Sequence, residues 1–432
     1  MKTAMPVSMA SLFIGACLAF GQSANDPPPA SSAKPLTELL PAKPVDFGCG
    51  GGADCSPLPG PGCRLVTAEF EYLLWSFPKR PDPFISDASN RLDMGGTIVQ
   101  RTLGEESLAK HIQSGARFTL GYWLTEPNIW TARNEIQCLG VEGRFFFVGQ
   151  QSRAIEDSTS PAIVRPFFDV NNHREFFLPI AAPGYGSGII TALAKHDMWG
   201  AELSLWKNLY FNPLGTVFGV YGLCGFRYVG FDSDVEIHTV SVVNSTITNT
   251  VLLPDFGSLA GSRIDAAEAF TTHNNFYGAE VGVRFEWNNQ LMILDTDIRF
   301  AIGSTHEDLN IVGTQTRTVG GATTTSVGDL LALPSNIGQH QKWQFSQIPE
   351  IDVKLKFPVA SHLTLTTGFS ALYWTHLARA SEQIDRQIDI SQIPNFPPGV
   401  GVASTGLGVP AVLFRQTELW LVGISAGAEF RW

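Results

Sequence analysis

Charged side chains recur at every second position in several segments of this 432-residue chain. Between Asn275 and Trp287, for example, Glu280, Arg284 and Glu286 stand on one parity and apolar residues on the other. Residues two apart in a β-strand point to the same side of a sheet, so the segment predicts a strand with one charged face. Charges of both signs on such faces can pair with one another, or they can line a polar passage that selects ions.

Candidate functional residues are the charges on the polar faces of these strands. The acids are Glu69, Glu71, Glu142, Glu202, Glu280, Glu286, Asp295, Asp297, Glu350, Asp352 and Glu429. The bases are Arg117, Arg144, Arg227, Arg284, Arg299, Lys354, Lys356 and Arg431. Because the acids outnumber the bases, a passage between these faces would favour cations.

Ten segments carry the alternation, and their other faces are apolar. They cover residues 66–76, 113–125, 135–149, 196–206, 217–235, 275–287, 291–303, 345–357, 363–375 and the segment that ends at 432. A soluble sandwich would also alternate. Aromatic residues near the strand ends favour a membrane, because they gather at both bilayer interfaces. These residues are Trp75, Trp123, Trp206, Trp287, Trp374 and Trp432.

The connections between the strands alternate between short and long. Short, turn-rich pieces join every second pair, whereas the other links span residues 77–112, 150–195, 236–274, 304–344 and 376–417. Outer-membrane barrels have tight periplasmic turns and extended outer loops. We therefore expect an all-β fold, a transmembrane antiparallel up-and-down β-barrel of about 10 strands (10–12), with both termini in the periplasm. Pro349 interrupts one strand, which predicts a bulge or a position near the rim.

The last strand presents a purely apolar face that ends on an aromatic residue. That face includes Ile424, Ala426, Ala428, Phe430 and Trp432. We expect it to contact outer-membrane lipid and to serve as the C-terminal insertion signal that the barrel-assembly machinery engages.

The N-terminal part reads as an export signal followed by a tether. Residues 1–21 combine Lys2, a short apolar core and small residues at the cleavage spacing, as in a secretory signal peptide. Residues 22–63 are rich in proline and glycine, and we expect a disordered periplasmic tether ahead of a barrel at 64–432. The spacing of Cys49, Cys55 and Cys63 fits no zinc pattern, and Cys17 lies in a loosely lipoprotein-like box. Cys138 and Cys224 are expected to be packed within strands.

Several blocks resemble the planctomycete-type outer-membrane β-barrel porin family, called beta barrel porin-seven. They include Ala68-Glu69-Phe70-Glu71-Tyr72-Leu73-Leu74-Trp75, Gly115-Ala116-Arg117-Phe118-Thr119-Leu120-Gly121-Tyr122-Trp123, Gly225-Phe226-Arg227-Tyr228, Phe276-Tyr277-Gly278-Ala279-Glu280-Val281-Gly282 and Glu382-Gln383-Ile384-Asp385. The resemblance runs from about residue 65 to the end and implies a single-chain outer-membrane barrel of a diderm bacterium. It brings no catalytic motif with it. The terminal Trp432 departs from the phenylalanine that is commoner in outer-membrane barrels.

Three functions remain open at this stage. The first is a narrow porin that passes small solutes through a charged lumen. The second is a closed, salt-bridge-filled barrel with a structural or surface-adhesion role, for which the loop Thr314 to Ser326 offers a contact surface. A ten-stranded lumen is narrow enough for arginine and glutamate side chains to cross and pair.

The third and most remote function is an outer-loop protease. Its candidates, in or beside predicted loops, are His173, His238, His273, His306, Glu307 and Asp308. Their spacing specifies neither a nucleophile nor a base, so we assign no catalytic, metal-binding or cofactor-binding residue and expect no enzyme. The formal net charge of −11 argues against nucleic acid as a partner.

Overall fold

The computed structural model describes residues 66–77, 112–123, 139–160, 162–212, 217–246, 259–289, 291–395 and 406–432. The predicted signal peptide and tether, with Cys17, Cys49, Cys55 and Cys63, lie outside these residues. No helix of the described part is long and apolar enough to cross a membrane.

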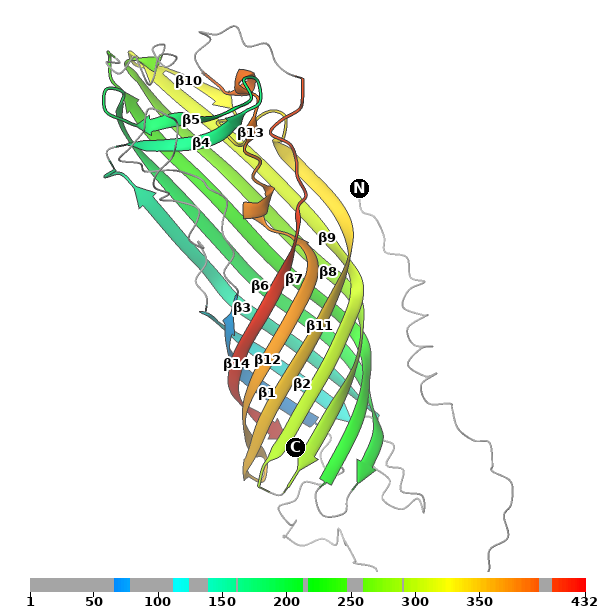
Figure 1. The fold of residues 1–432 in the computed structure, drawn as a ribbon. Helices are drawn as coiled ribbons and strands as arrows, with labels where there is room; N and C mark the ends of the chain where they lie inside the picture. The colour runs from blue at the N-terminus through cyan, green and yellow to red at the C-terminus, as the bar shows by residue number, and fades with distance from the viewer. Residues whose placement is uncertain are drawn as a thin grey trace, which may run out of the picture.

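Ten antiparallel strands close into a tilted barrel within the described ranges, as the sequence predicts (Figure 1). In order around the barrel they are β1 (Val66–Ser76), β2 (Ile112–Trp123), β3 (Leu139–Asp157), β6 (Gly186–Asn212), β7 (Val217–Val243), β8 (Ser262–Asn288), β9 (Ile293–Val319), β11 (Gly338–Ala360), β12 (Leu363–Ala378) and β14 (Gln416–Arg431). The last strand pairs with the first and closes the ring, with Ala68 opposite Phe430 and Trp75 opposite Gly423.

The two ends of the barrel differ in their connections. At the end where β14 finishes, β8 and β9 are joined by residues 289–292, and β11 and β12 by residues 361–362 (Figure 1). Asn289 stabilises the first of these turns, because its side-chain oxygen accepts hydrogen bonds from the backbone of Leu291 and Met292. We call this end the turn end, and the opposite one the cap end.

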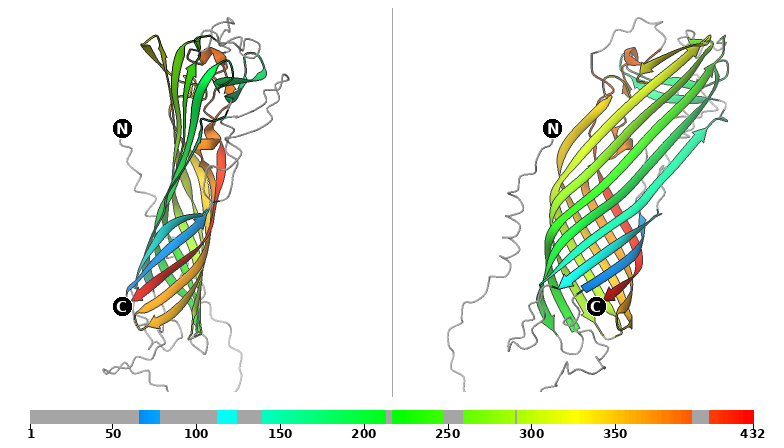
Figure 2. Two further views of the ribbon diagram at one scale, coloured as in Figure 1. Left: turned by 90° about the vertical axis from the view of Figure 1, so that its left-hand side faces the viewer. Right: turned by 180° about the vertical axis from the view of Figure 1, so that it is seen from behind.

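Five neighbouring strands continue beyond the predicted boundaries towards the cap end, as can be followed in Figure 2. Strands β6, β7, β8 and β9 have 27 residues each, and β11 has 23. Much of the predicted loops 150–195, 236–274 and 304–344 is therefore strand, and these boundaries were wrong.

The predicted strands were too short because the apolar face of each long strand changes from the outer to the inner side along its length. On β7, Phe226 points outward and Arg227 is buried, as the prediction for a lipid-facing strand requires. Nearer the cap end, Glu236 points outward while Val235 and Ile237 are buried. The period of two continues, but apolar and polar residues exchange faces.

An outward belt of aromatic side chains marks the height of this reversal. Trp199 and Tyr228 have ring centroids 4.5 Å apart, Tyr228 and Tyr277 5.2 Å, and Tyr277 and Trp343 6.3 Å. Just beyond the belt, outward positions turn polar. There Oδ1 of Asp232 lies 2.9 Å from Nδ1 of His273.

A second set of outward aromatic residues lies about ten residues nearer the turn end. On β7, Phe218 is ten residues before Tyr228 and contacts Tyr210 of β6, with centroids 6.4 Å apart. Ten residues at about 3.3 Å each, tilted by about 40°, span about 25 Å, the height of the apolar band of outer-membrane barrels. The remainder of β6 to β9 therefore projects beyond the bilayer.

Four of the six tryptophans expected at the membrane interfaces point inward instead. Trp75 and Trp374 are only 2% and 0% exposed, and Trp123 and Trp206 line a cavity inside the barrel. In each strand the tryptophan alternates with the outward apolar residues and so lies on the polar, inward face. Proximity to a strand end was therefore a misleading criterion for an interfacial position. Trp432, by contrast, is outward and exposed.

Pro349 lies in the middle of β11 and causes no register shift against β9, so the predicted bulge is absent. The ladder between β11 and β12 instead begins at the next residue, with Glu350 opposite Leu372. Since proline has no N–H to donate, its position suits the point at which pairing on that side ends.

A small second sheet covers the cap end from inside (Figure 1). It consists of β4 (Ile163–Asp169), β5 (Arg174–Ala181) and β13 (Gln387–Ile388), in the order β13-β4-β5. Its apolar residues pack on the inward faces of the long strands and on residues 330–333, forming a core that includes Phe167, Phe270 and Leu309. Strand β10 (Ala322–Val327) folds back on β9 as a hairpin beside this cap.

The boundary of the membrane band can be tested with two matched substitutions on β6. Leu203, 62% exposed, lies within the band, whereas Ile189, 42% exposed, lies on the same outward face beyond the belt. Leu203→Arg should lower the free energy of unfolding in phospholipid vesicles by about 2–4 kcal/mol, the cost of a charge near the bilayer midplane. Ile189→Arg should change it by less than about 0.5 kcal/mol, as surface substitutions do. Equal effects of the two, measured by guanidinium chloride titration, would contradict the assignment.

Candidate functional site

We call the part of the barrel between the aromatic belt and the second set of aromatic residues the membrane band. Its interior is the most chemically distinctive part of the molecule. Of the nineteen charged residues selected from the sequence, most are buried, and the less buried Arg284, Glu286, Lys354 and Arg431 line a cavity inside the barrel. Alternation in the strands explains this placement, because the opposite parity carries the lipid-facing residues.

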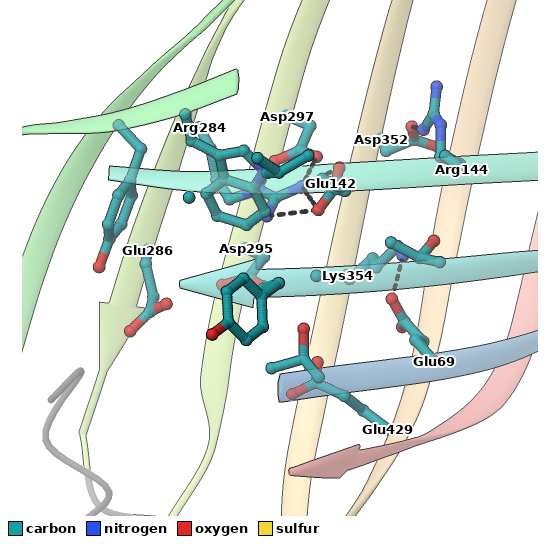
Figure 3. A pocket seen from close by; sticks show the side chains of 18 of the residues that line it. Glu69, Glu142, Arg144, Arg284, Glu286, Asp295, Asp297, Asp352, Lys354 and Glu429 are labelled. Atoms are coloured by element: carbon teal, nitrogen blue, oxygen red, sulfur yellow. Dashed lines mark hydrogen bonds and ion pairs between the residues drawn. The ribbon is translucent and has the colours of Figure 1, made fainter. Parts of the chain in front are cut away.

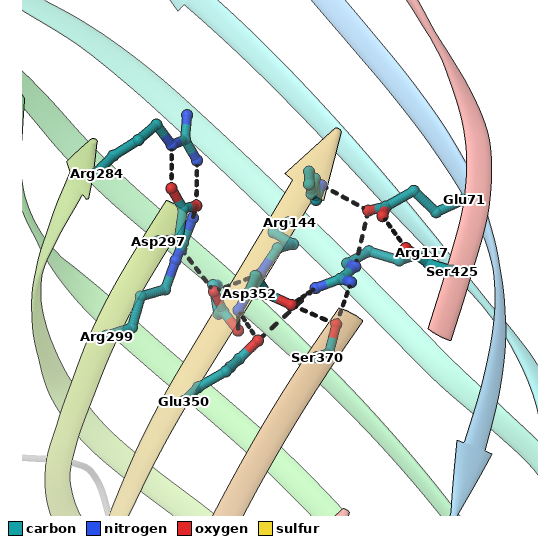
Figure 4. Close-up of polar contacts among 12 residues, drawn as sticks. Glu71, Arg117, Arg144, Arg284, Asp297, Arg299, Glu350, Asp352, Ser370 and Ser425 are labelled. Atoms are coloured by element: carbon teal, nitrogen blue, oxygen red, sulfur yellow. Dashed lines mark hydrogen bonds and ion pairs between the residues drawn. The ribbon is translucent and has the colours of Figure 1, made fainter. Parts of the chain in front are cut away.

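Arg144 of β3 stands at the centre of the interior (Figure 4). Its guanidinium donates to both carboxylate oxygens of Glu202 at 2.8 and 2.9 Å, to Glu350 at 2.8 Å and to Asp352 at 2.8 Å. One cation therefore links strands β3, β6 and β11 across the lumen.

Two further arginines, on β7 and β9, join this group of acids. Arg227 contacts Glu202 at 2.7 Å and Glu280 at 2.8 Å, and also pairs with Glu350. Arg299 contacts Glu202 at 3.0 Å and Glu280 at 3.2 Å. Each carboxylate is thus shared by two or three guanidinium groups.

Two side branches extend this network to β1 and β8. Arg117 pairs with Glu71 at 2.9 Å and Asp352 at 2.9 Å, and Lys354 bridges Glu69 and Glu71 at 2.8 Å each. On the other side, Arg299 contacts Glu142 and Asp297. Arg284 also pairs with both and lies over the Trp206 ring, 3.9 Å from its centroid.

A smaller cluster lies nearer the turn end. Lys356 contacts Asp295 at 2.5 Å and Glu429 at 2.8 Å, and Arg431 pairs with Glu429. Glu286 makes no hydrogen bond or ion pair with any described residue. Buried charges are tolerated when paired and hydrogen-bonded, whereas Glu286 is only partly buried and faces the cavity (Figure 3).

An apolar layer lies directly above the charges, on the cap side of the network. On the inward face of β1, Leu73 and Trp75 follow Glu71; on β3, Phe146 and Val148 follow Arg144. Other strands contribute in the same way, and the layer comprises Leu73, Trp75, Phe77, Phe146, Val148, Met198, Val229, Phe231, Phe276, Ala301, Ile348, Leu372, Trp374, Leu377, Leu419 and Leu421. We call this set the apolar layer. Its members are at most 3% exposed, so solvent does not reach these side chains.

Glycines on the inward faces make room for the large rings of the layer. A Cβ atom on Gly200 would lie 2.4 Å from the Phe146 ring, and one on Gly278 would lie 2.4 Å from the Phe276 ring. Any side chain at these two positions would have to displace an aromatic residue from the layer.

The apolar layer was not predicted, although the sequence carries a signal for it. Alternation disappears where both faces are apolar, as in Tyr72-Leu73-Leu74-Trp75, Phe145-Phe146-Phe147-Val148 and Leu419-Trp420-Leu421-Val422. Such runs occur on several strands at one height, which indicates a layer that crosses the lumen.

Beyond the membrane band, a second group of charges ties the cap to the wall. Arg165 of β4 pairs with Glu268 of β8 and donates to Asp329 at 2.7 Å. The Glu268 carboxylate also accepts hydrogen bonds from the backbone of Leu330 and Ala332 at 2.8 and 2.9 Å. Burial raises the pKa of Asp329 to about 6, the Glu268 carboxylate adds to the rise, and Arg165 opposes it.

Three of the residues considered for a protease lie together on the outer face of the wall: His273 of β8 and Asp308 of β9 are cross-strand partners, and His306 is two residues from Asp308. His238, His273 and His306 lie on long strands, on the outward side of the wall, and not in loops. His238 pairs with Asp265 at 2.9 Å, and His306 stacks on Trp343 with centroids 4.7 Å apart.

Glu307 and His173 lie apart from that outward group. Glu307 is buried and accepts a hydrogen bond from Gln416 at 2.9 Å, Asp308 accepts from Gln339, and His173 lies in the turn between β4 and β5. Within the described ranges, no three His, Cys, Asp or Glu residues are grouped so that they could hold a metal ion. Cys224 is disulfide-bonded and therefore not merely packed, whereas Cys138 lies outside the described residues.

The sequence and the fold were compared with known families and solved structures. A sequence profile of the beta barrel porin-7 (BBP7) family matches residues 69–432. No curated protein matches. Among solved structures, the outer membrane protease OmpT from Escherichia coli is similar with 7% identity and a TM-score of 0.38, over 85% of this chain and 97% of that one. An outer-membrane OmpT of Vibrio cholerae shows 8% identity and a TM-score of 0.13 over the same shares.

The network makes a specific prediction for Arg144. Arg144→Leu leaves Glu202, Glu350 and Asp352 with too few cations in a buried site, so the free energy of unfolding should fall by about 3–5 kcal/mol. Lys195→Leu removes only the exposed pair with Glu236, whose side chains are 30% and 48% exposed, and should cost less than about 1 kcal/mol. Chemical denaturation in vesicles measures both; a loss below about 1 kcal/mol for Arg144→Leu would contradict the account.

The cap should become less stable as the pH rises from about 4 to 6. Because the folded-state pKa of Asp329 is raised above its ordinary value, the folded cap binds more protons than the unfolded chain in this window. Its opening free energy should therefore fall by about 2–3 kcal/mol across the window and then level off. Hydrogen-exchange protection of Leu330 to Ala332 measures this fall, and Asp329→Asn should abolish it. Protection that increases across the window in the native protein would refute the assignment.

Proposed function

This chain belongs to the beta barrel porin-7 family, and we propose that it is an outer-membrane barrel whose interior is closed to solutes. In this proposal the barrel is a structural anchor that carries the cap and the projecting wall above the membrane. The apolar layer carries the proposal, because it lies across the lumen and its side chains are almost fully buried.

Two further features support a closed interior. Below the apolar layer, the charged side chains are joined to one another instead of lining an open passage, with Arg144 alone bound to three carboxylates. Above it, the core between the cap sheet and the long strands is also apolar. A hydrated ion would have to cross both apolar regions, where no polar groups replace the water molecules of its hydration shell.

The competing function is a narrow porin for small solutes, for which the acid-rich interior would favour cations. That function requires a water path past Trp75, Phe146 and Trp374, which are all at most 2% exposed. The two functions therefore differ in whether the apolar layer opens.

In this proposal the turn end and both termini face the periplasm, and the cap end faces outward. Support comes from the short connections at the turn end, which resemble the periplasmic turns of outer-membrane barrels. The last strand offers an apolar surface to lipid and to the barrel-assembly machinery. Its outward residues include Ile424, Phe430 and Trp432, which are 58%, 48% and 58% exposed.

A surface-contact role is part of the same proposal. The hairpin of β9 and β10 bears exposed threonines that pair across the strands, Thr316 with Thr325 at 3.2 Å and Thr318 with Thr323 at 3.1 Å. These pairs give the tip of the barrel an uncharged, hydroxyl-rich surface that could contact cell-surface partners.

Single-channel recording tests the closed interior directly. Folded protein, verified by its heat-modifiable gel migration, should produce no step currents in planar bilayers under either polarity of the applied voltage. Reproducible unitary steps from that material would overturn the proposal and favour the narrow porin.

A further inference from the structure

Strand β10 is an edge strand at the top of the cap end (Figure 1). Among the described residues it pairs with β9 alone, and five of its six residues are exposed. Its sequence, Ala-Thr-Thr-Thr-Ser-Val, contains neither a charged residue nor a proline. Native proteins commonly place such residues on edge strands, because an unprotected edge pairs with another chain. The edge of β10 is therefore open to a further strand.

The turn of the hairpin determines which backbone groups of β10 lie on this open edge. Two glycines, both with positive φ, form a two-residue loop between Val319 and its partner Ala322. In such a loop the closing pair is hydrogen-bonded, and along an antiparallel ladder hydrogen-bonded and non-hydrogen-bonded pairs then alternate. The backbone N–H and C=O groups of Thr323 and Thr325 consequently point away from β9.

The threonine side chains support this assignment. In an antiparallel ladder, the pairs that exchange no backbone hydrogen bonds are the ones with the closer side chains. The hydroxyl oxygens of Thr323 and Thr318 lie 3.1 Å apart, and those of Thr325 and Thr316 lie 3.2 Å apart. Both contacts fit non-hydrogen-bonded pairs, which leaves the backbone groups of Thr323 and Thr325 available to a neighbour on the open edge.

A second copy of β10 is complementary to this edge. In the antiparallel register with the longest overlap, Thr324 lies opposite Thr324 of the second copy, and Thr323 lies opposite Thr325 of the second copy. These last two residues carry the open backbone groups in both copies, so each such pair exchanges two hydrogen bonds. The residues that meet are uncharged, so no like charges oppose one another although the net charge of the chain is −11. Outward threonines then form a ladder that crosses both hairpins.

We propose that β10 is a self-association strand, which pairs in antiparallel fashion with β10 of a second copy of this chain. The two-fold axis that relates two such strands is perpendicular to their common sheet. The wall that bears β10 continues the barrel wall beyond the membrane band (Figure 2), so this axis is parallel to the membrane. The two copies therefore point in opposite directions, and the contact joins two apposed outer membranes.

This inference rests on the surface-contact role in the proposed function and names the partner. A contact of two short strands is small, so the strength of a junction between two membranes comes from many copies that engage together. The closed interior is a separate claim, because conductance through the barrel does not depend on the edge of β10.

Clustering of phospholipid vesicles that carry the folded, full-length mature protein tests the proposal. Light scattering should show that these vesicles cluster, whereas labelled vesicles without protein stay out of the clusters. Thr324→Lys should abolish clustering, because it places two ammonium groups opposite each other, and Thr324→Glu should abolish it through two carboxylates. A mixture of the two variant populations should cluster again, because a lysine then lies opposite a glutamate.

Val312→Lys is the matched control. It adds the same charge to the outward face of β9, where Val312 is 45% exposed, away from the edge of β10, and should cluster like the native protein. Dispersed native vesicles, undiminished clustering of both Thr324 variants, or a variant mixture that stays dispersed would overturn the proposal. Heat-modifiable migration verifies that each variant is folded. Clustering vesicles whose protein also produces step currents would contradict the closed interior alone.

Discussion

Most charges inside this barrel are neutralised by another side chain, because lipid surrounds the wall and, above the cavity at the turn end, the lumen is too narrow to keep charges hydrated. Ten strands give a lumen that arginine and glutamate side chains can cross, and Arg144 does so by joining carboxylates of β6 and β11. Much of the interior follows from this constraint. The acids and bases interleave, shared carboxylates bind several guanidinium groups, and the network holds opposite walls together in place of an apolar core.

A second constraint is the height of the bilayer, which decides the face of each strand that must be apolar. Within the membrane band the outward residues contact hydrocarbon, and many of the inward residues carry charge. Beyond Trp199, Tyr228 and Tyr277 the outward residues meet water, so the same strands turn their apolar residues inward and cover them with a separate sheet. One set of long strands thus serves as a membrane barrel at one end and as the wall of an ordinary hydrophobic core at the other.

The sequence predicted the parts of this structure that depend on local alternation. The ten strands and their outward residues could be read from period two, since it is a property of single strands, whereas the family resemblance came from particular sequence blocks. The upper halves of β7 and β9 could not, because a criterion tuned to lipid-facing strands rejects Asp234 and Asp308 on an outward face. The apolar layer was hidden where Leu73 and Phe146 made both faces apolar. The ion pairs were also beyond reach, as Arg117 and Asp352 lie 235 residues apart and only the closed ring brings them together.

In the function proposed above, this outer-membrane barrel holds the cap above the bilayer. The central claim is the reversal of polarity at the aromatic belt, and carbene labelling from a diazirine dissolved in the bilayer tests it most directly. Six outward apolar residues of similar exposure serve as reporters: Leu203, Phe226, Val281, Ile189, Val242 and Val312. Mass spectrometry should find the label on the first three and not on the last three. Comparable labelling of both groups would contradict the account.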